Sequence, residues 1–321
     1  MSAVTRMSLA RTPSAISVLL LVGTFVAIGI IQPDALTYDG LSLILVGAMP
    51  VVLATMAQLF IMAAGDIDLG IGQFVGLVNV TAAASLGTQP GIAILGLALA
   101  AVAYVLMGAL ITYRGIPSIV VTFGMGSIWL GVSLLIMPTP GGEAPGWLSA
   151  AANAEPPLVP LPIIVFAVLT VVVYLLLNRT RLGIRLRAVG ASPEAATRVG
   201  LSVIRLKMTL YGLAALMGLL AGLVLTGSTG SGDANGAATL VLSTVAAVIV
   251  GGGEFRGGRV DAVGAVCAAV AIGLITSIMA FLNVSAAYTS AVEGLILVVA
   301  LGVRVVAFRR LRPPSRALAA P

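Results

Sequence analysis

Two aspartates one residue apart, Asp66 and Asp68, are the side chains whose type and spacing come closest to a chemical site. They lie in the glycine-flanked run 65–72. An Asp-x-Asp pair could bind a divalent cation, but two carboxylates supply only part of the roughly six to eight oxygen ligands of a calcium site, and nothing nearby in the sequence adds more. Asp is a favoured helix N-cap, and negative charge is stabilised at a helix N-terminus. We therefore expect a structural turn at a helix break, with N-capping as the main role of the pair.

The rest of the composition excludes the common catalytic devices. The chain has no His and one Cys, Cys267, so neither a Ser-His or Cys-His nucleophile nor a Cys/His metal site can form. The glycine-rich run 251–258 does not contain the Gly-Lys-Ser/Thr of a phosphate-binding loop, because the only lysine is Lys207. We predict no catalytic residue, no metal and no cofactor bound by this chain. The glycines predict a tight turn and a close approach of the two flanking helices.

The elements that must position these residues are membrane-spanning helices. Of the 321 residues, 60% are hydrophobic and 9% are charged, and the mean hydropathy is +1.15. Such a chain cannot bury its apolar residues in a core of this size. The apolar runs are continuous, unlike the alternating segments of a β-barrel, and most approach the roughly 20 residues that a spanning helix needs. We predict an all-α integral membrane protein with about ten transmembrane helices, at 15–32, 41–64, 70–87, 91–112, 117–137, 162–178, 208–227, 238–251, 260–281 and 288–307.

The basic residues predict the orientation. With ten crossings, all 17 Lys and Arg residues fall on one side of the membrane, which the positive-inside rule makes the cytoplasmic side. Both termini are then cytoplasmic, and the sequence pI of about 10.1 needs no nucleic acid as partner. The expected organisation is a cytoplasmic tail 1–14, a single transmembrane domain 15–307 with a cytoplasmic loop 179–207, and a basic cytoplasmic tail 308–321.

A short helix is predicted inside the loop 179–207. Ser192 is a good N-cap, Pro193 suits the first helical position, Glu194 favours the positive end of the helix dipole, and Gly200 is a natural stop. Arg198 lies four residues after Glu194, which adds a favourable charge pair. An isolated helix of about two turns is marginal in water, so this one must dock. It either lies on lipid headgroups or binds another protein.

This segment resembles the cytoplasmic loop of the ribose-type sugar permeases, membrane subunits of bacterial ABC importers in the branched-chain amino acid/ribose permease superfamily. Their Gly-x-Asn-Pro-Glu-Ala-Ala-x-x-x-Gly pattern is matched from Gly190 to Gly200, with Ser192 in place of Asn. The run 65–72 is similar to the family's Gly-Ile-Asp-Leu-Ser-Val-Gly. The run 250–259 is similar to its Gly-Gly-x-x-x-x-Gly-Gly-Arg-Gly, with a departure at Val260, where Gly is usual. The three motifs occur in order, and the resemblance covers nearly the whole chain.

The resemblance implies a type II ABC-importer permease fold in the bacterial cytoplasmic (inner) membrane. It implies a second permease chain, two ATP-binding subunits that hold ATP and magnesium, an extracytoplasmic solute-binding protein, contacts with membrane lipid and no nucleic acid. The solute would be small and polar, a monosaccharide first of all. The ATPase-coupling helix carried over to this chain comprises Ser192, Pro193, Glu194, Ala195, Ala196, Thr197, Arg198, Val199 and Gly200.

Polar residues inside or beside the apolar runs are candidates for the solute pathway. A sugar needs hydrogen-bond partners and an aromatic face, although small polar residues also join helices in lipid. Glu293 stands within the tenth run, where a carboxylate faces a cavity or a partner unless it lies close enough to the interface to reach water. The candidates for pathway or structural roles are Asp66, Asp68, Gln73, Asn79, Trp129 and Glu293.

A second class of protein is compatible with the composition. A ten-helix secondary transporter of the drug/metabolite type has similar length and hydropathy. Such carriers show two similar halves, short loops and buried acids for ion coupling. The 30-residue basic loop with a capped helix favours the importer instead. An intramembrane enzyme is disfavoured, because the sequence offers neither His nor two acids facing each other in the membrane.

Overall fold

A computed structural model describes residues 14–255 and 257–284, with single positions at 288, 291, 292, 294, 295, 298 and 302. The predicted tails, the predicted role of Glu293 and most of the predicted tenth helix lie outside the described residues. Within them the chain is helical, and the one extended pairing is an isolated bridge between Gly141 and Gly232. The elements are α2 (Ala15–Ile31), η1 (Pro33–Leu36), α3 (Tyr38–Ala63), α4 (Ile71–Thr81), η2 (Ala82–Leu86), α5 (Pro90–Arg114), α6 (Ser118–Ile136), α7 (Gly146–Ala152), α8 (Leu161–Arg179), α9 (Arg181–Ala191), α10 (Pro193–Arg198), α11 (Val203–Thr229), α12 (Leu240–Val250) and α13 (Ala262–Phe281).

Helices cover the first nine predicted apolar runs, but they differ in length. Six of the described helices, α3, α5, α6, α8, α11 and α13, are long and apolar enough to cross a membrane. Three others are shorter: α2, α4 continued by η2, and α12. With a rise of about 1.5 Å per residue, the 11 residues of α12 extend only about 16 Å, roughly half of a bilayer core. Ten complete crossings and the cytoplasmic location of both ends remain predictions.

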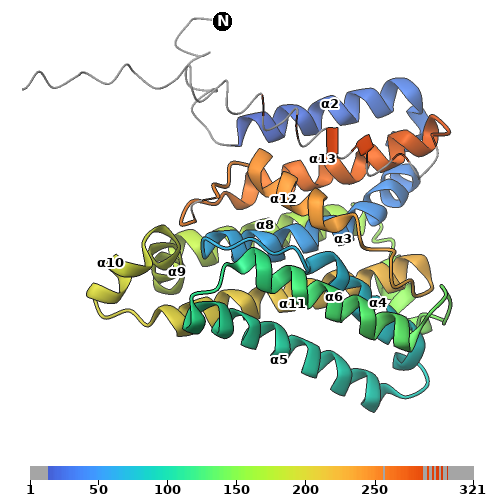
Figure 1. Cartoon of the computed structure of the whole chain (residues 1–321). Coiled ribbons are helices and arrows are strands. Elements are labelled where there is room, and N and C mark those ends of the chain that lie inside the picture. Colours follow the sequence, from blue (N-terminus) through green and yellow to red (C-terminus); the bar gives the residue numbers. More distant parts are fainter. Residues whose placement is uncertain are drawn as a thin grey trace, which may run out of the picture.

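Helix α3 is the centre of the bundle (Figure 1). Of its most apolar 18 residues, 89% are buried, against 28% for α5 and 22% each for α6 and α8. Helices α8, α11, α12 and α13 all pack on α3. The outer helices expose large apolar side chains, such as Leu135 and Phe123 of α6, as expected of surfaces that face lipid or another membrane chain.

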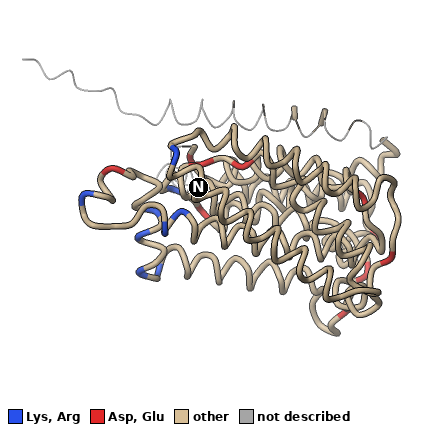
Figure 2. Tube along the Cα trace, turned by 60° about the horizontal axis from the view of Figure 1, so that its bottom comes forward, with Lys and Arg blue, Asp and Glu red and all other residues tan. Residues whose placement is uncertain are grey.

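The basic residues gather at one end of the bundle (Figure 2). We call this the basic end. Acidic residues occur at both ends in the same view. The separation matches the charge bias of a positive-inside protein. The described basic residues are Arg114, Arg179, Arg181, Arg185, Arg187, Arg198, Arg205, Lys207 and Arg259.

Two non-helical segments, 64–70 and 230–239, lie against the short helix α4. The first leads directly into its start, and the second runs along it from Gly72 to Asn79. Unpaired backbone is costly in lipid, so such segments must be enclosed by protein. Ala237 in the second segment is buried, and its carbonyl oxygen would lie 2.5 Å from a Cβ atom placed on Gly72 of α4. Ala234 approaches Gly76 in the same way, at 2.9 Å. The two glycines thus allow irregular backbone to pack directly on α4.

Candidate functional site

The short helix predicted around residues 192–200 is present as α10. The Ser192 hydroxyl accepts a hydrogen bond from the Ala195 N–H at 3.2 Å, Pro193 occupies the first turn together with Glu194, and Gly200 adopts a φ of +80° just beyond the helix. These are the start and stop features that the sequence predicted. The position of this helix in the fold bears on its role.

Helix α10 projects from the basic end. Figure 1 shows α9 and α10 outside the stack of long helices. Only Ala196 of α10 is buried, and the side chain of Val199, directly after it, is 74% exposed. A helix of six residues with an exposed valine beside it has a surface available for another molecule.

The three sequence motifs that resemble the sugar permeases meet beside α9 and α10. A Cβ atom on Gly190 of α9 would lie 1.8 Å from the Ala63 carbonyl oxygen at the end of α3, and 2.8 Å from the Gly258 nitrogen. The Gly258 N–H donates to that same Ala63 oxygen at 3.1 Å. A Cβ on Gly257 would lie 2.5 Å from the Gly65 Cα. We call Gly65, Gly190, Gly257 and Gly258 the glycine junction.

Backbone conformation explains three of these glycines and packing explains the fourth. Gly65, Gly257 and Gly258 have φ values of +81°, +76° and +75°, which residues with a Cβ atom rarely adopt. Gly190 is helical but has no room for a side chain. The junction therefore joins the loop after α12, the end of α9 and the end of α3 through backbone contacts.

The predicted close approach of the helices around the third motif is confirmed. A Cβ on Gly264, at the start of α13, would lie 1.9 Å from the Gly251 carbonyl oxygen at the end of α12. The tight turn between the two helices follows from Gly252, whose φ is +109°, and from the two junction glycines. Arg256 of the same motif lies outside the described residues.

Asp66 forms a buried ion pair that the sequence analysis did not anticipate. The Lys207 ammonium, from the second turn of α11, donates to both Asp66 carboxylate oxygens at 2.9 and 2.8 Å. The Tyr211 hydroxyl, one turn further along α11, donates to the same carboxylate at 3.2 Å. Both side chains of the pair are about nine-tenths buried. The expectation that Asp66 caps α4 is therefore wrong, because its oxygens belong to a partner 141 residues away.

Asp68 also forms hydrogen bonds at the same helix break. Its carboxylate accepts a hydrogen bond from the Tyr104 hydroxyl of α5 and another from the Gly70 N–H at 2.6 Å, directly before α4. The capping expectation is thus close for Asp68, although the bonded N–H group precedes the first helical residue. With a lysine on Asp66 and a tyrosine on Asp68, both carboxylates serve the fold, which argues against the metal-binding interpretation.

The backbone of the break is held by α6. The Ile67 N–H donates to the Ser118 hydroxyl at 3.1 Å, and the Leu69 N–H donates to the Thr122 hydroxyl at 3.0 Å. Thr122 in turn donates to the Ile67 carbonyl oxygen at 3.2 Å. Side-chain hydroxyls of α6 therefore replace the hydrogen bonds that a continuous helix would have made here.

Asn79 likewise forms hydrogen bonds to non-helical backbone, near the C-terminal end of α4. Its amide nitrogen donates to the Thr226 hydroxyl and to the Ser231 carbonyl oxygen, both at 3.0 Å, while its oxygen accepts from the Asp233 N–H at 2.7 Å. The side chain is buried. Asn79 thus has a structural position, holding the segment 230–239 against α4 and α11.

The side chains of Gln73 and Trp129 each have a polar atom that lacks a hydrogen-bond partner within the described residues. They lie on the packed helices α4 and α6, and Gln73 Oε1 is 3.5 Å from the point where Gly126 would carry a Cβ atom. The Trp129 ring contacts Phe74 edge-on, with ring centres 5.6 Å apart. Within the described residues, neither Gln73 Oε1 nor Trp129 Nε1 has a hydrogen-bond partner, although both atoms are buried. A hydroxyl group, which both donates and accepts, is the chemistry that would satisfy the two atoms.

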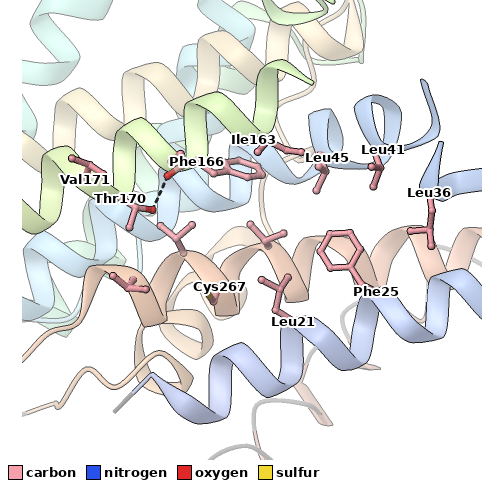
Figure 3. Close-up of a pocket in the computed structure, with 14 residues that line it drawn as sticks. Leu21, Phe25, Leu36, Leu41, Leu45, Ile163, Phe166, Thr170, Val171 and Cys267 are labelled. Atoms are coloured by element: carbon pink, nitrogen blue, oxygen red, sulfur yellow. Dashed lines mark hydrogen bonds between the residues drawn. The ribbon is translucent and has the colours of Figure 1, made fainter. Parts of the chain in front are cut away.

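A groove of about 710 Å³ lies between α2, α3, α8 and α13 (Figure 3). Its walls are almost wholly apolar, formed by side chains such as Phe25, Leu45 and Phe166. The hydroxyl of Thr170 is already bonded to the Phe166 carbonyl oxygen at 2.6 Å. A polyhydroxylated solute would find no polar partners there, so the groove is unsuited to a sugar.

The comparisons with known proteins bear on the three motifs and the fold. A family model described as "Branched-chain amino acid transport system / permease component" matches residues 40–301. The chain belongs to this family. It is 28% identical to the autoinducer 2 import system permease protein LsrD of Enterobacter sp. (strain 638) over 291 residues, 88% of this chain and 89% of the relative. It is 29% identical to the ribose import permease protein RbsC of Bacillus subtilis (strain 168) over 255 residues, 78% of this chain and 79% of the relative.

The resemblance to the ribose-type sugar permeases is therefore confirmed. The permease is a multi-pass protein of the bacterial cytoplasmic membrane. A further relative, the probable ABC transporter permease protein y4mJ of Sinorhizobium fredii (strain NBRC 101917 / NGR234), is 28% identical over 86% of this chain and 84% of its own length. These matches favour the importer class over the secondary transporter. No solved structure matches the permease.

Proposed function

We propose that this permease is the membrane-spanning subunit of an ATP-binding-cassette importer that moves a monosaccharide, or a small polar solute of similar chemistry, into the cell. The family and the relatives named for ribose and autoinducer 2 import support the sugar-like solute. ATP and magnesium bind to a separate ATPase subunit, and this chain breaks no covalent bond. A second permease chain completes the transmembrane pathway, and an extracytoplasmic binding protein delivers the solute.

The observation that carries this proposal is the exposed, capped helix α10 at the basic end. Its cap satisfies the Ala195 N–H, Ala196 packs against the neighbouring helices, and the other residues of α10 are exposed and accessible to a partner. Docking of the ATPase on the segment from Ser192 to Gly200 would couple the conformational changes of ATP binding and hydrolysis to the membrane helices. Two alternating arrangements of those helices would then open the pathway to one side at a time.

Gln73 and Trp129 are the best supported pathway residues in the described part of the chain. A sugar hydroxyl could donate to Gln73 Oε1 and accept from Trp129 Nε1, the two buried atoms without partners. The contact would form in an arrangement that separates α4 from α6. Asp66, Asp68 and Asn79 support the fold instead, because each is fully engaged within the bundle.

The proposal is tested by purification and transport. The permease, expressed with the ATPase and binding protein of its importer, should co-purify with the ATPase and drive ATP-dependent uptake in proteoliposomes. The double variant Glu194→Lys with Ala195→Asp places a positive charge at the positive end of the helix dipole and changes an exposed contact residue. We expect this variant to insert normally but to lose the ATPase and uptake.

The control for the Glu194→Lys part of this variant is Glu155→Lys, the same substitution at an exposed residue of the α7–α8 connection. It should retain the ATPase. If the α10 variant keeps full ATPase binding and uptake, or if the permease alone transports solute without ATP, the proposed function is wrong.

A further inference from the structure

We infer that the buried Asp66–Lys207 pair transmits displacement of α10 to the helix break 64–70, and from there to α6. This inference rests on the proposed function, since it assumes that an ATPase moves α10. It concerns residues outside the docking helix and assigns Asp66 and Lys207 a positioning role in the transport cycle.

The first step is the short connection from α10 to Lys207. Helix α10 ends at Arg198, and α11 begins at Val203, so Lys207 follows the docking helix by nine residues. Helix α11 runs unbroken for 27 residues and packs on α3, α4 and α5. A helix moves as a unit over its first turns, so displacement of α10 displaces the Lys207 backbone.

The second step is the strength of the link. The Lys207 ammonium binds both oxygens of Asp66, and the Tyr211 hydroxyl on the same helix binds the carboxylate as well. Separating the pair would leave each charge without its partner at a site where both side chains are about nine-tenths buried, which is costly. The break is therefore expected to follow the start of α11 instead of parting from it.

The third step is the hydrogen bonding between the break and α6. Ser118 and Thr122 accept the Ile67 and Leu69 N–H groups, so α6 carries the hydrogen bonds of the break. Of the most apolar 18 residues of α6, 22% are buried, and among the described helices its main packing partner is α4, which directly follows the break. A contiguous set of contacts thus leads from α10 through α11 and residues 64–70 to α6.

The fourth step is space for the movement. A pocket of about 420 Å³ lies beside the ion pair at the basic end. Pro193 of α10, Val203 and Lys207 of α11, Asp66 of the break and Ser118 of α6 all line it. Every member of the proposed connection therefore borders one space, into which the segments can shift without overlapping packed side chains.

The experiment measures solute transported per ATP hydrolysed, using the permease assembled with its ATPase and binding protein in proteoliposomes. The main variant is the double change Asp66→Asn with Lys207→Met. It removes both charges together, because replacing a whole buried pair is far better tolerated than leaving one charge alone. The matched control is Arg205→Met, which removes a positive charge from an exposed position on the first turn of α11.

We expect the double variant to assemble with the ATPase and hydrolyse ATP, while its transport per ATP falls by roughly tenfold or more, within the usual range of coupling between sites. The Arg205→Met variant should keep the wild-type ratio. As a second readout, a cysteine replacing the exposed Ser127 of α6, in a chain with Cys267→Ala, should change its thiol reactivity on ATP addition only when the pair is intact.

Two results would overturn the inference. One is a wild-type transport ratio in the double variant, and the other is an unchanged ATP response of the α6 thiol without the pair. If the double variant does not assemble, the single variant Tyr211→Phe, which removes only the third hydrogen bond to Asp66, takes its place with the same two readouts. Failure of the proposed function is distinguishable, because then the wild-type permease itself would show neither ATPase binding nor ATP-dependent uptake.

Discussion

Replacing Gly190 by alanine should separate α9 from the end of α3. The new Cβ atom would lie 1.8 Å from the Ala63 carbonyl oxygen, whereas such contacts are essentially never shorter than 3.0 Å, so the two backbones must part by at least 1.2 Å. A change of side-chain rotamer cannot relieve this contact, because the Ala63 oxygen is a backbone atom and the Cβ position is fixed by the backbone of α9. The same displacement stretches the 3.1 Å hydrogen bond between the Gly258 N–H and the Ala63 oxygen.

The loss of unfolding free energy in Gly190→Ala can be built up from three contributions. Overpacking costs about 1–3 kcal/mol, and the strained hydrogen bond adds roughly 0.5–1.5 kcal/mol. The better helix propensity of alanine returns about 1 kcal/mol, which leaves a net loss of about 0.5–3.5 kcal/mol. Because α10 continues directly from α9, uptake should fall as well, even though the substituted residue lies outside the docking helix.

The assay is unfolding of the purified permease in mixed detergent micelles, followed by the tryptophan fluorescence of the buried Trp129 and the exposed Trp147. The control is Gly23→Ala in α2, where nothing lies within 4 Å of the new Cβ atom. The control should be as stable as the wild type or slightly more stable. If the unfolding midpoint of Gly190→Ala equals that of Gly23→Ala, the glycine junction is not a close contact, and the reasoning from its geometry fails.

Other substitutions test the buried polar groups and the cap. Asn79→Leu leaves the Asp233 N–H without its acceptor and should destabilise the permease by about 2–4 kcal/mol in the same unfolding assay, since several hydrogen bonds are lost at once; stability equal to the wild type would contradict the anchoring role of Asn79. Tyr104→Phe removes the hydroxyl donor to Asp68 and should cost about 1.5–3 kcal/mol, the usual value for a hydrogen bond to a charged group; no measurable loss would mean that the bond is not made. Ser192→Ala removes the α10 cap and should weaken ATPase retention by an amount equivalent to about 0.5–2 kcal/mol, measured by co-purification yield over a dilution series, and unchanged retention would show that the cap is dispensable.

Local features of the sequence were sufficient to predict the positions of the apolar helices among the described residues and the form of α10, but not α7 or α9, which lie in predicted loops. Continuous apolar runs locate helices whatever they pack against, and the cap at Ser192 and the stop at Gly200 act within a few residues. The predicted run 238–251 was already shorter than a spanning helix, and α12 is shorter still. Ala238, which begins that run, belongs instead to the irregular backbone that packs on Gly72, a contact that hydropathy does not register.

The ion pair of Asp66 could not be derived from neighbouring residues, because Lys207 is 141 positions away. One signal was nevertheless present. Lys207 is the sole lysine and begins an apolar run, and an ionisable residue at that place needs a partner. The aspartates of the run 65–72 were among the acids that the topology placed at the same end, together with Glu194, Glu254 and Asp261. The glycine junction was visible only as separate motifs, since their contact is a property of the packed bundle.

The burial of Lys207 also has a chemical consequence. Because this chain carries a single side-chain amine and its ammonium is engaged by both oxygens of Asp66, reagents that acylate lysine should leave the folded side chain unmodified. Acylation at that position would then report any separation of the two segments, which our inference expects not to occur. Mass spectrometry of the Lys207 peptide, compared between nucleotide states of the assembled transporter, should therefore find this amine protected in each state.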